Sequence, residues 1–251
     1  MTDTEHHTIP VADGESLVAV HHPAPDPAAD WFVCCHGFAS DRTGSYEGRC
    51  ERAVAEGYHG VRFDFRGCGD ADGAFAAATL SARIADLRAV LDHLVPDEGS
   101  VVLFGSSFGG KTAFHAAAGG GPRGDGTPDE RVTAVATRAP VTHGRAFDPL
   151  AEAVRTQGEV EYAPGFPVDE RLVDDLAGYD FGDVADRLDV PVAVFHGRDD
   201  DSVPLADSLD AVGALDTDAA LWAVADEGHR FSREAEAQMR DRLFDWLARL
   251  D

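Results

Sequence analysis

The stretch Val101-Val-Leu-Phe-Gly-Ser-Ser-Phe-Gly-Gly110 joins two segments of different character through a short turn. Its first four residues are apolar and rich in valine, which predicts a short buried strand. The segment 111–118, Lys-Thr-Ala-Phe-His-Ala-Ala-Ala, predicts a helix. Between the two lies Gly105-Ser-Ser-Phe-Gly109, a G-x-S-x-G pattern that acquires meaning from this strand, turn and helix context.

Ser107 is the residue that such a turn presents. The turn forces its central serine into a strained backbone conformation, so the residues two before and two after it must lack a Cβ atom. Gly105 and Gly109 meet this need for Ser107, whereas Ser106 has phenylalanines at the corresponding places. The pattern therefore predicts that Ser107 is a nucleophile held out at the end of the strand. The alternative is a plain glycine-rich turn.

The charge of the chain restricts its partners. The formal net charge is −25, and Lys111 is the only lysine among 21 fixed cations. Such a surface repels nucleic acid and anionic membranes, so neither is an expected partner. We interpret the charge as adaptation to high salt, which screens the self-repulsion. The alternative is an ordinary acidic cytosolic protein.

Cysteine usage and the N-terminus predict a cytoplasmic protein. Cys34, Cys35, Cys50 and Cys68 lack disulfide-scaffold or zinc-type spacing and are expected to be reduced thiols. Residues 1–10 are polar and do not have the pattern of a secretion signal. No apolar run approaches membrane-spanning length.

Short apolar strands alternate with helices along the chain. Strands are predicted at 31–35, 60–65, 101–104, 131–141, 191–195 and 219–225, and helices at 45–56, 79–95, 111–118, 205–215 and 232–250, the last capped by Ser232. This order predicts an α/β fold, a doubly wound and mostly parallel sheet with helices on both faces. Residues 8–22 alternate around Asp13-Gly14, which predicts two antiparallel edge strands joined by a two-residue turn.

One domain spanning 1–251, with one short insertion around 142–187, fits this pattern better than two domains. The insertion is less regular and carries aromatic residues among many acids. Residues 119–128 are rich in glycine, proline and aspartate and are expected to form an exposed, mobile loop.

Five motifs in one order carry a resemblance to a known family. They are His36-Gly-Phe38, Asp64-Phe-Arg-Gly67, Gly105-Ser-Ser-Phe-Gly109, the segment 196–204 (His-Gly-Arg-Asp-Asp-Asp-Ser-Val-Pro) and Gly228-His-Arg-Phe231. In these motifs the chain resembles the α/β-hydrolases nearly end to end, and most of all their small esterase-like branch near the feruloyl-esterase and dienelactone-hydrolase-like proteins. The order serine, acid, histidine is that family's.

The resemblance implies a catalytic triad, and each residue type also has a chemical reason. A serine hydroxyl needs a base within hydrogen-bond reach, and histidine suits because its ordinary pKa lies near neutrality. His229 follows a predicted strand at the same sheet edge as Ser107. Asp200 is the acid that would orient it, from the alignment of Val203 and Pro204 with the family's H-G-x-x-D-x-x-V-P. Asp199 and Asp201 adjoin Asp200, so a one-residue shift and a merely solvated acidic loop stay as alternatives.

Two backbone amides must receive the negative charge of the tetrahedral intermediate. One is the amide of Phe108, directly after the nucleophile and at a helix N-terminus. The resemblance implies that the other is the amide of Phe38. For substrate binding, the candidates are Phe147, Tyr162 and Phe166, which either line an acyl pocket or merely cover a small lid.

Other residues have weaker signals. His196 is expected to hold its loop rather than to catalyse. The pairs at 6–7 and 21–22 and His143 lack a convincing ligand set, so no metal and no cofactor is expected. Asp64 and Arg66 are expected to fix their loop by ion pairing, and Cys68 is expected to be a small buried residue.

The sequence thus predicts a serine hydrolase that cleaves carboxylic esters of small molecules through an acyl-enzyme. A thioesterase, peptidase or acyltransferase with the same triad is the alternative within enzymes. A hydrolase-fold binding protein without turnover is the alternative outside them. The acyl group, the alcohol and the oligomeric state do not follow from these patterns.

Overall fold

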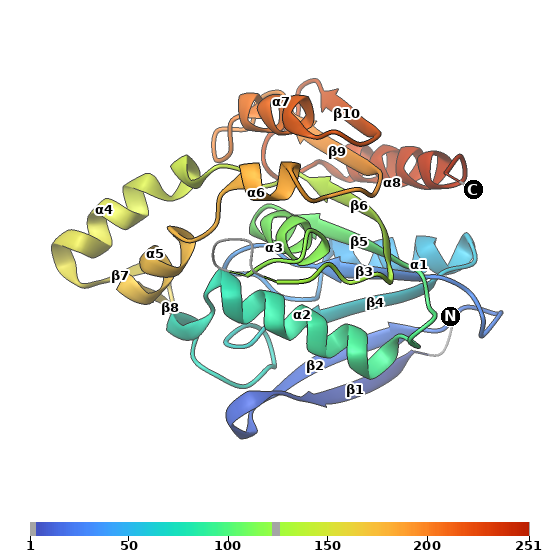
Figure 1. Ribbon diagram of the computed structural model, residues 1–251, viewed down its shortest axis with the longest axis horizontal. Helices are drawn as coiled ribbons and strands as arrows, with labels where there is room; N and C mark the ends of the chain where they lie inside the picture. The colour runs from blue at the N-terminus through green and yellow to red at the C-terminus, as the bar shows by residue number, and fades with distance from the viewer. Residues whose placement is uncertain (1–3, 122–125, 251) are drawn as a thin grey trace.

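A computed structural model describes residues 4–121 and 126–250 of the chain, and an eight-stranded sheet runs through it (Figure 1). The strand order is β1-β2-β4-β3-β5-β6-β9-β10. β1 and β2 are antiparallel to their neighbours, and the other six strands run parallel. The strands are β1 Glu5–Pro10, β2 Ser16–His22, β3 Trp31–Cys35, β4 His59–Asp64, β5 Val101–Ser106, β6 Val132–Arg138, β9 Val192–Gly197 and β10 Ala219–Val224. The predicted α/β class, with a mostly parallel sheet and antiparallel first strands, is confirmed.

Helices cover both faces of this sheet (Figure 1). The helices are α1 Ser45–Ala55, α2 Leu80–Leu94, α3 Phe108–Ala117, α6 Phe181–Ala185, α7 Leu205–Ala214 and α8 Arg233–Leu247. One apolar cluster joins α1 and α8 to one face of the central strands, and a larger cluster joins α2, α3, α6 and α7 to the other. Because the central strands bury side chains on both faces, they are apolar almost without interruption, as the sequence indicates.

The first two strands differ from the prediction in their turn. β1 begins at Glu5, and Pro10 pairs with Ser16, so the connection is a five-residue loop that contains a short 3₁₀ turn at Ala12–Gly14. The predicted two-residue turn at Asp13-Gly14 is therefore wrong. A two-residue hairpin needs positive φ or a primed turn at its two central residues, and here the amide of Glu15 instead bonds back to the carbonyl of Ala12.

The segment between β6 and β9 is more regular than its sequence indicates. It contains a 3₁₀ turn at Gly144–Phe147, α4 Asp148–Gln157, the hairpin strands β7 Glu159–Ala163 and β8 Phe166–Asp169, α5 Glu170–Leu176, and α6. Figure 1 shows α4, α5, β7 and β8 gathered on one side of the molecule, in yellow to orange. Only α6 lies back over the sheet, where Phe181 meets Phe114 of α3 with ring centroids 5.4 Å apart.

The parallel strands place their following loops at a common edge. β3, β5, β6, β9 and β10 run in the same direction, so the residues after each carboxyl end lie along one rim of the sheet. Ser232 caps α8 by accepting a hydrogen bond from the amide of Ala235 at 3.2 Å, as predicted. Of the predicted loop at 119–128, residues 122–125 lie outside the described part of the chain. None of the described helices is long and apolar enough to cross a bilayer.

Candidate active site

Ser107 occupies a tight turn between β5 and α3. Its backbone has φ 53° and ψ −119°, a conformation that L residues rarely adopt. A Cβ atom on Gly105 would overlap the backbone of Gly109 and Gly110, and one on Gly109 would overlap the carbonyls that follow β3. The two glycines that the sequence pattern requires are thus the positions with no room for a side chain. The turn holds the Ser107 side chain at the rim of the sheet.

A chain of hydrogen bonds joins the three side chains that the sequence pointed to. Ser107 Oγ lies 3.0 Å from His229 Nε2, and His229 Nδ1 lies 2.8 Å from Asp200 Oδ2. Because a carboxylate only accepts, Nδ1 is the donor in the second bond, and Nε2 is left to accept from the serine hydroxyl. The Asp200 side chain is fully buried, whereas that of His229 is 22% exposed. This arrangement can move a proton from Ser107 to the ring.

Asp200 is held as an anion by several donors. The amides of Ser202 and Val203 each donate to Oδ1 at 2.9 Å, and His196 Nε2 lies 3.2 Å from Oδ2. Burial alone would raise the pKa of the Asp200 carboxyl, but the hydrogen bonds from His196, His229 and Val203 outweigh it and hold that pKa well below its usual range. A carboxylate that stays charged can stabilise a cationic His229 ring.

The neighbouring Asp201 does not contact His229. The Asp201 side chain accepts from the hydroxyl of Ser202 at 3.3 Å and lies in an open cavity. His196 is completely buried between the hydroxyl of Ser208, 2.7 Å from Nδ1, and the carbonyl of Val203, 2.9 Å from Nε2. It therefore fastens the loop that carries Asp200, which is the role that the sequence suggested.

Phe108 directly follows Ser107, and Phe38 lines the same cavity as Ser107. Phe108 is the first residue of α3, and Gly37 is so close that a Cβ atom on it would come within 3.6 Å of the Ser107 Cβ. Neither the Phe38 amide nor the Phe108 amide is engaged by an acceptor from the described residues. The rings of Phe38 and Phe108 meet with centroids 5.2 Å apart. Two unengaged donors next to a serine hydroxyl are suited to stabilise an oxyanion.

Arg83, which the sequence did not single out, holds the backbone of His36 and Gly37 that precedes the Phe38 amide. It is fully buried on α2, and its Nη2 donates to the carbonyls of His36 at 2.6 Å and Gly37 at 3.2 Å. Burial and the charge of Arg83 lower the pKa of His36 well below its ordinary value, so the His36 ring is neutral. With the two carbonyls turned toward Arg83, the next amide is free to face Ser107. An arginine in an amphipathic helix gives no such signal in sequence.

Asp64 and Arg66 both form ion pairs, as predicted, but each pairs with another residue and not with each other. Arg66 pairs with the buried Asp86 of α2 at 2.7 Å. Asp64 pairs with Arg42 and also accepts from the amides of Arg42 and Asp70. Asp86 thus holds the loop after β4 through Arg66, and Asp64 joins the loops after β3 and β4 through Arg42 and Asp70.

A cavity of about 430 Å³ opens above Ser107 and is referred to below as the aromatic cavity. Its walls include Phe38, Phe147, Tyr162, Val141 and Leu150, and Ser107, His229 and Arg230 also line it. The Phe38 ring packs against Phe147 at 5.4 Å and against Tyr162 at 4.9 Å, centroid to centroid. Phe166 does not line this cavity, because its ring packs on Phe75 instead, at 4.8 Å. Two of the three aromatic candidates therefore lie at the cavity.

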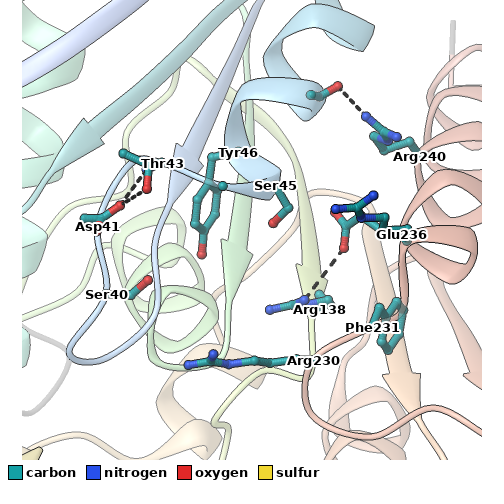
Figure 2. Close-up of a pocket in the computed structure, with 13 residues that line it drawn as sticks. Ser40, Asp41, Thr43, Ser45, Tyr46, Arg138, Arg230, Phe231, Glu236 and Arg240 are labelled. Carbon is teal, nitrogen blue, oxygen red and sulfur yellow. Dashed lines mark hydrogen bonds and ion pairs between the residues drawn. The ribbon is translucent and has the colours of Figure 1, made fainter.

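A second cavity, of about 780 Å³, adjoins the first and is referred to below as the arginine cavity (Figure 2). Arg138, Arg230, Arg233 and Arg240 line it together with Tyr46. Arg230, the residue after His229, lines both cavities. No motif in the sequence predicts that these side chains converge.

The four cysteines and the histidines other than His229 are not among the residues that line these cavities. Glu5, His7 and His21 each bring one ligand atom within 4.8 Å of the others, so β1 and β2 do assemble a group of metal-ligand type that the sequence analysis did not expect. It lies at the edge of the sheet, whereas Ser107 follows a central strand. The four cysteines are free and buried, and burial raises the pKa of the Cys68 thiol to about 11.

Comparison with known proteins places the chain in a family. The profile described as "Alpha/beta hydrolase family" matches residues 32–245. Mitochondrial palmitoyl-protein thioesterase ABHD10 of Bos taurus is 27% identical over 211 residues, which cover 76% of this chain and 65% of the relative. The match thus spans a little under two thirds of that relative's length.

Solved structures share the fold over almost the whole chain. Mouse alpha/beta hydrolase domain-containing protein 10 superimposes with a TM-score of 0.82 at 20% identity, covering 98% of this chain and all of its own. Est1E from Butyrivibrio proteoclasticus, solved with ferulic acid bound, superimposes with a TM-score of 0.80 at 21% identity and covers 97% and 98% of the two chains.

Proposed function

This chain belongs to the alpha/beta hydrolase family, and we propose that it is a serine hydrolase that cleaves small carboxylic esters through an acyl-enzyme. Ser107 is the nucleophile, His229 the general base and acid, and Asp200 the group that orients His229. The observation that carries the proposal is the unbroken hydrogen-bond chain from Ser107 Oγ to Asp200, at 3.0 Å and 2.8 Å, beneath an open cavity.

Acylation begins with attack of Ser107 Oγ on the ester carbonyl carbon, while the hydroxyl proton passes to His229 Nε2. The carbonyl oxygen becomes an oxyanion, which the amides of Phe38 and Phe108 stabilise. Preorganised donors of this kind are each worth roughly 3–4 kcal/mol of barrier in other enzymes. The bond to the leaving oxygen then breaks, and His229 gives its proton to that oxygen. The alcohol leaves, and the acyl group stays on Ser107.

Deacylation repeats these steps with water. His229 takes a proton from a water molecule, whose oxygen attacks the acyl carbon, and then returns a proton to Ser107 Oγ as the acid departs. Asp200 stays ionised throughout, because its donors favour the charged form. The aromatic cavity accommodates the acyl group, since Phe38, Phe147 and Leu150 offer it apolar side chains and the cavity opens directly on Ser107.

Covalent labelling tests this proposal. A fluorophosphonate should label the wild-type protein at Ser107, and 4-nitrophenyl acetate or butyrate should be hydrolysed. Ser107→Ala should lose both properties, whereas Ser106→Ala should keep the label. Ser106 is the matched control because it is the adjacent hydroxyl but bonds to Arg49 at 3.1 Å on the other side of the strand. A folded wild-type protein that neither takes the label nor cleaves any ester or thioester would support a binding protein instead.

Thioester hydrolysis is the second candidate. It is favoured by the relative that carries the name palmitoyl-protein thioesterase, whose similarity covers 76% of this chain. The same residues would act, with a thiol as the leaving group. Parallel assays on oxygen and sulfur esters with the same acyl group distinguish the two, since kcat/KM should be higher for the preferred leaving atom.

A further inference from the structure

The arginine cavity concentrates positive charge in a strongly acidic protein. Of 21 fixed cations in a chain of net charge −25, four arginines line this one cavity, and Arg49 lies buried behind it. The cavity's own acids are Asp41 and Glu236. Five cations therefore face two anions at this place, an excess that opposes the charge of the whole molecule.

Glu236 offsets only part of this charge, because it is shared between Arg49 and Arg138, with both of which it forms ion pairs. Its Oε1 accepts from Arg49 Nε at 2.6 Å, while Oε2 lies 3.6 Å from Arg138 Nη1, too far for a hydrogen bond. Arg138 Nε is buried and bonds to no acceptor among the described residues. Burial and the charges of Arg49 and Arg230 lower the pKa of Arg138 from its ordinary value, although Glu236 opposes this. An arginine in such surroundings is stabilised by an added anion.

Other donors face the same space. Figure 2 shows the Tyr46 hydroxyl and the guanidinium groups of Arg138 and Arg230 pointing into the cavity. The Tyr46 oxygen accepts from the Gly37 amide at 3.3 Å, so its own hydrogen is left to donate outward. Arg230 and Arg233 form no ion pair with any residue in the described ranges. Planar guanidinium donors and a hydroxyl suit a carboxylate or a phosphate.

The position of the cavity indicates which part of a substrate it would meet. The leaving oxygen must face His229, because that ring returns the proton to it. The two residues after His229, Arg230 and Phe231, form the cavity wall, and Arg230 is shared with the aromatic cavity above Ser107. A group attached to the leaving oxygen can therefore extend into the arginine cavity while the acyl group occupies the aromatic one.

We propose that the arginine cavity is an anion subsite for the leaving group, and that the substrates are esters whose alcohol part carries a carboxylate or phosphate. Arg230 and Arg138 would bind the anion, with Tyr46 as a further donor. The inference rests on the proposed ester hydrolysis, but it concerns recognition and can be measured without turnover.

The test compares matched substrates and variants. 4-Acetoxybenzoate and 4-acetoxybenzamide share an acyl group and a shape but differ in charge. 4-Acetoxyphenyl phosphate is the corresponding substrate with a phosphate in place of the carboxylate. Arg230→Gln should lower the ratio of kcat/KM for the anionic esters to that for the neutral ester about tenfold or more. Arg230→Lys should retain part of the preference. Arg249→Gln, which removes an exposed arginine outside the cavity, is the control and should leave the ratio unchanged.

Binding to the Ser107→Ala protein separates this inference from the hydrolase proposal. Calorimetry with 4-hydroxybenzoate and 4-hydroxyphenyl phosphate should give a weaker Kd, by about tenfold, when Arg230→Gln is added. The probe with the larger Arg230-dependent loss identifies the preferred anion. If esters are cleaved but Arg230→Gln slows charged and neutral ones equally, the subsite is refuted while the hydrolase stands. If no ester is cleaved and the anions bind equally with and without Arg230, both fail.

Discussion

The aromatic cavity and the arginine cavity meet at Arg230, yet different side chains line them. In the first, the Phe38 ring contacts the rings of Phe147 and Tyr162, and these rings offer apolar surface to an acyl group. The second is lined by four guanidinium groups and two acids, and its positive charge would attract an anionic group. An ester has two parts of unequal chemistry, and this pair of cavities could recognise each part by a different force. Independent control of acyl and alcohol preference is the consequence.

The largest expected effect is at Asp200, which contacts His229. Asp200→Asn should reduce kcat about 10⁴-fold, by analogy with other triads, because an amide no longer holds His229 in the right tautomer or stabilises its charged form. The loss should be equal for charged and neutral leaving groups and for short and long acyl groups. Steady-state kinetics on the full substrate panel measures it.

Asp201→Asn is the matched control, since Asp201 lies in the aromatic cavity but does not contact His229. It should change kcat less than about threefold. If Asp201→Asn or Asp199→Asn proved the damaging change, the assignment of Asp200 would be off by one residue.

These residues also show how far the sequence could predict the site. Ser107 was predicted from the G-x-S-x-G pattern, and Asp200 and His229 from the resemblance to the family's motifs. Each follows a short apolar strand, and parallel strands bring such loops to one rim. The arginine cavity was not predicted. Arg138 and Arg230 lie at this rim, but Arg233 and Arg240 reach the cavity from α8, which packs beside α1 on one face of the sheet. Composition and spacing along the chain carry no signal for that packing.

The aromatic candidates show a similar limit. Phe147, Tyr162 and Phe166 were equivalent in sequence, and the β7–β8 hairpin turns Phe166 onto Phe75 while Tyr162 meets Phe38. The prediction of the turn after β1 failed for a different reason, because the dipeptide Asp13-Gly14 fits a two-residue hairpin and a longer loop equally well.

Lys111 provides the next largest effect and a contrast with the cavity arginines. It is 2% exposed on α3, and burial lowers its pKa from 10.5 to about 8, although Asp180 opposes this. At pH 7 the buried charge costs roughly 3 kcal/mol of folding free energy, from about 1.4 kcal/mol per pKa unit. Lys111→Met should therefore raise the unfolding free energy by an amount of this order, measured by urea denaturation.

The pH dependence is the internal control for Lys111. Between about pH 8 and 10.5 the unfolded chain binds more protons at this site than the folded one, so wild-type stability rises with pH across that window. The gain from Lys111→Met should be full below pH 8 and fade toward pH 10.5. A gain that is constant with pH would come from packing rather than charge.

Phe147→Ala should have a smaller effect that is confined to the acyl side. Removing this ring opens the wall against Phe38 and Phe108. We expect kcat/KM for a butyrate ester to fall about tenfold and that for the acetate ester much less, since a lost apolar contact is worth about 1–3 kcal/mol. The preference for an anionic alcohol should not change. Phe166→Ala, in the same segment but outside the cavity, is the control; an equal loss there would mean that the segment merely needs its packing.

The smallest expected effect is that of salt, which should weaken recognition in the arginine cavity but not in the aromatic cavity. At molar salt the Debye length falls to about 3 Å, so attraction between the cavity arginines and an anionic alcohol is screened. The ratio of kcat/KM for charged and neutral esters should therefore fall a few-fold between low and molar potassium chloride, while acyl-chain preference is kept or increased. The fold itself should respond in the opposite direction, because salt also screens the repulsion within a chain of net charge −25. Thermal melts at the same salt concentrations should show a rising Tm as the charge preference falls. A Tm that does not rise with salt would contradict the interpretation of the net charge as adaptation to high salt. A preference for the charged ester that salt does not weaken would mean that the shape of the alcohol, and not its charge, decides which alcohol is bound.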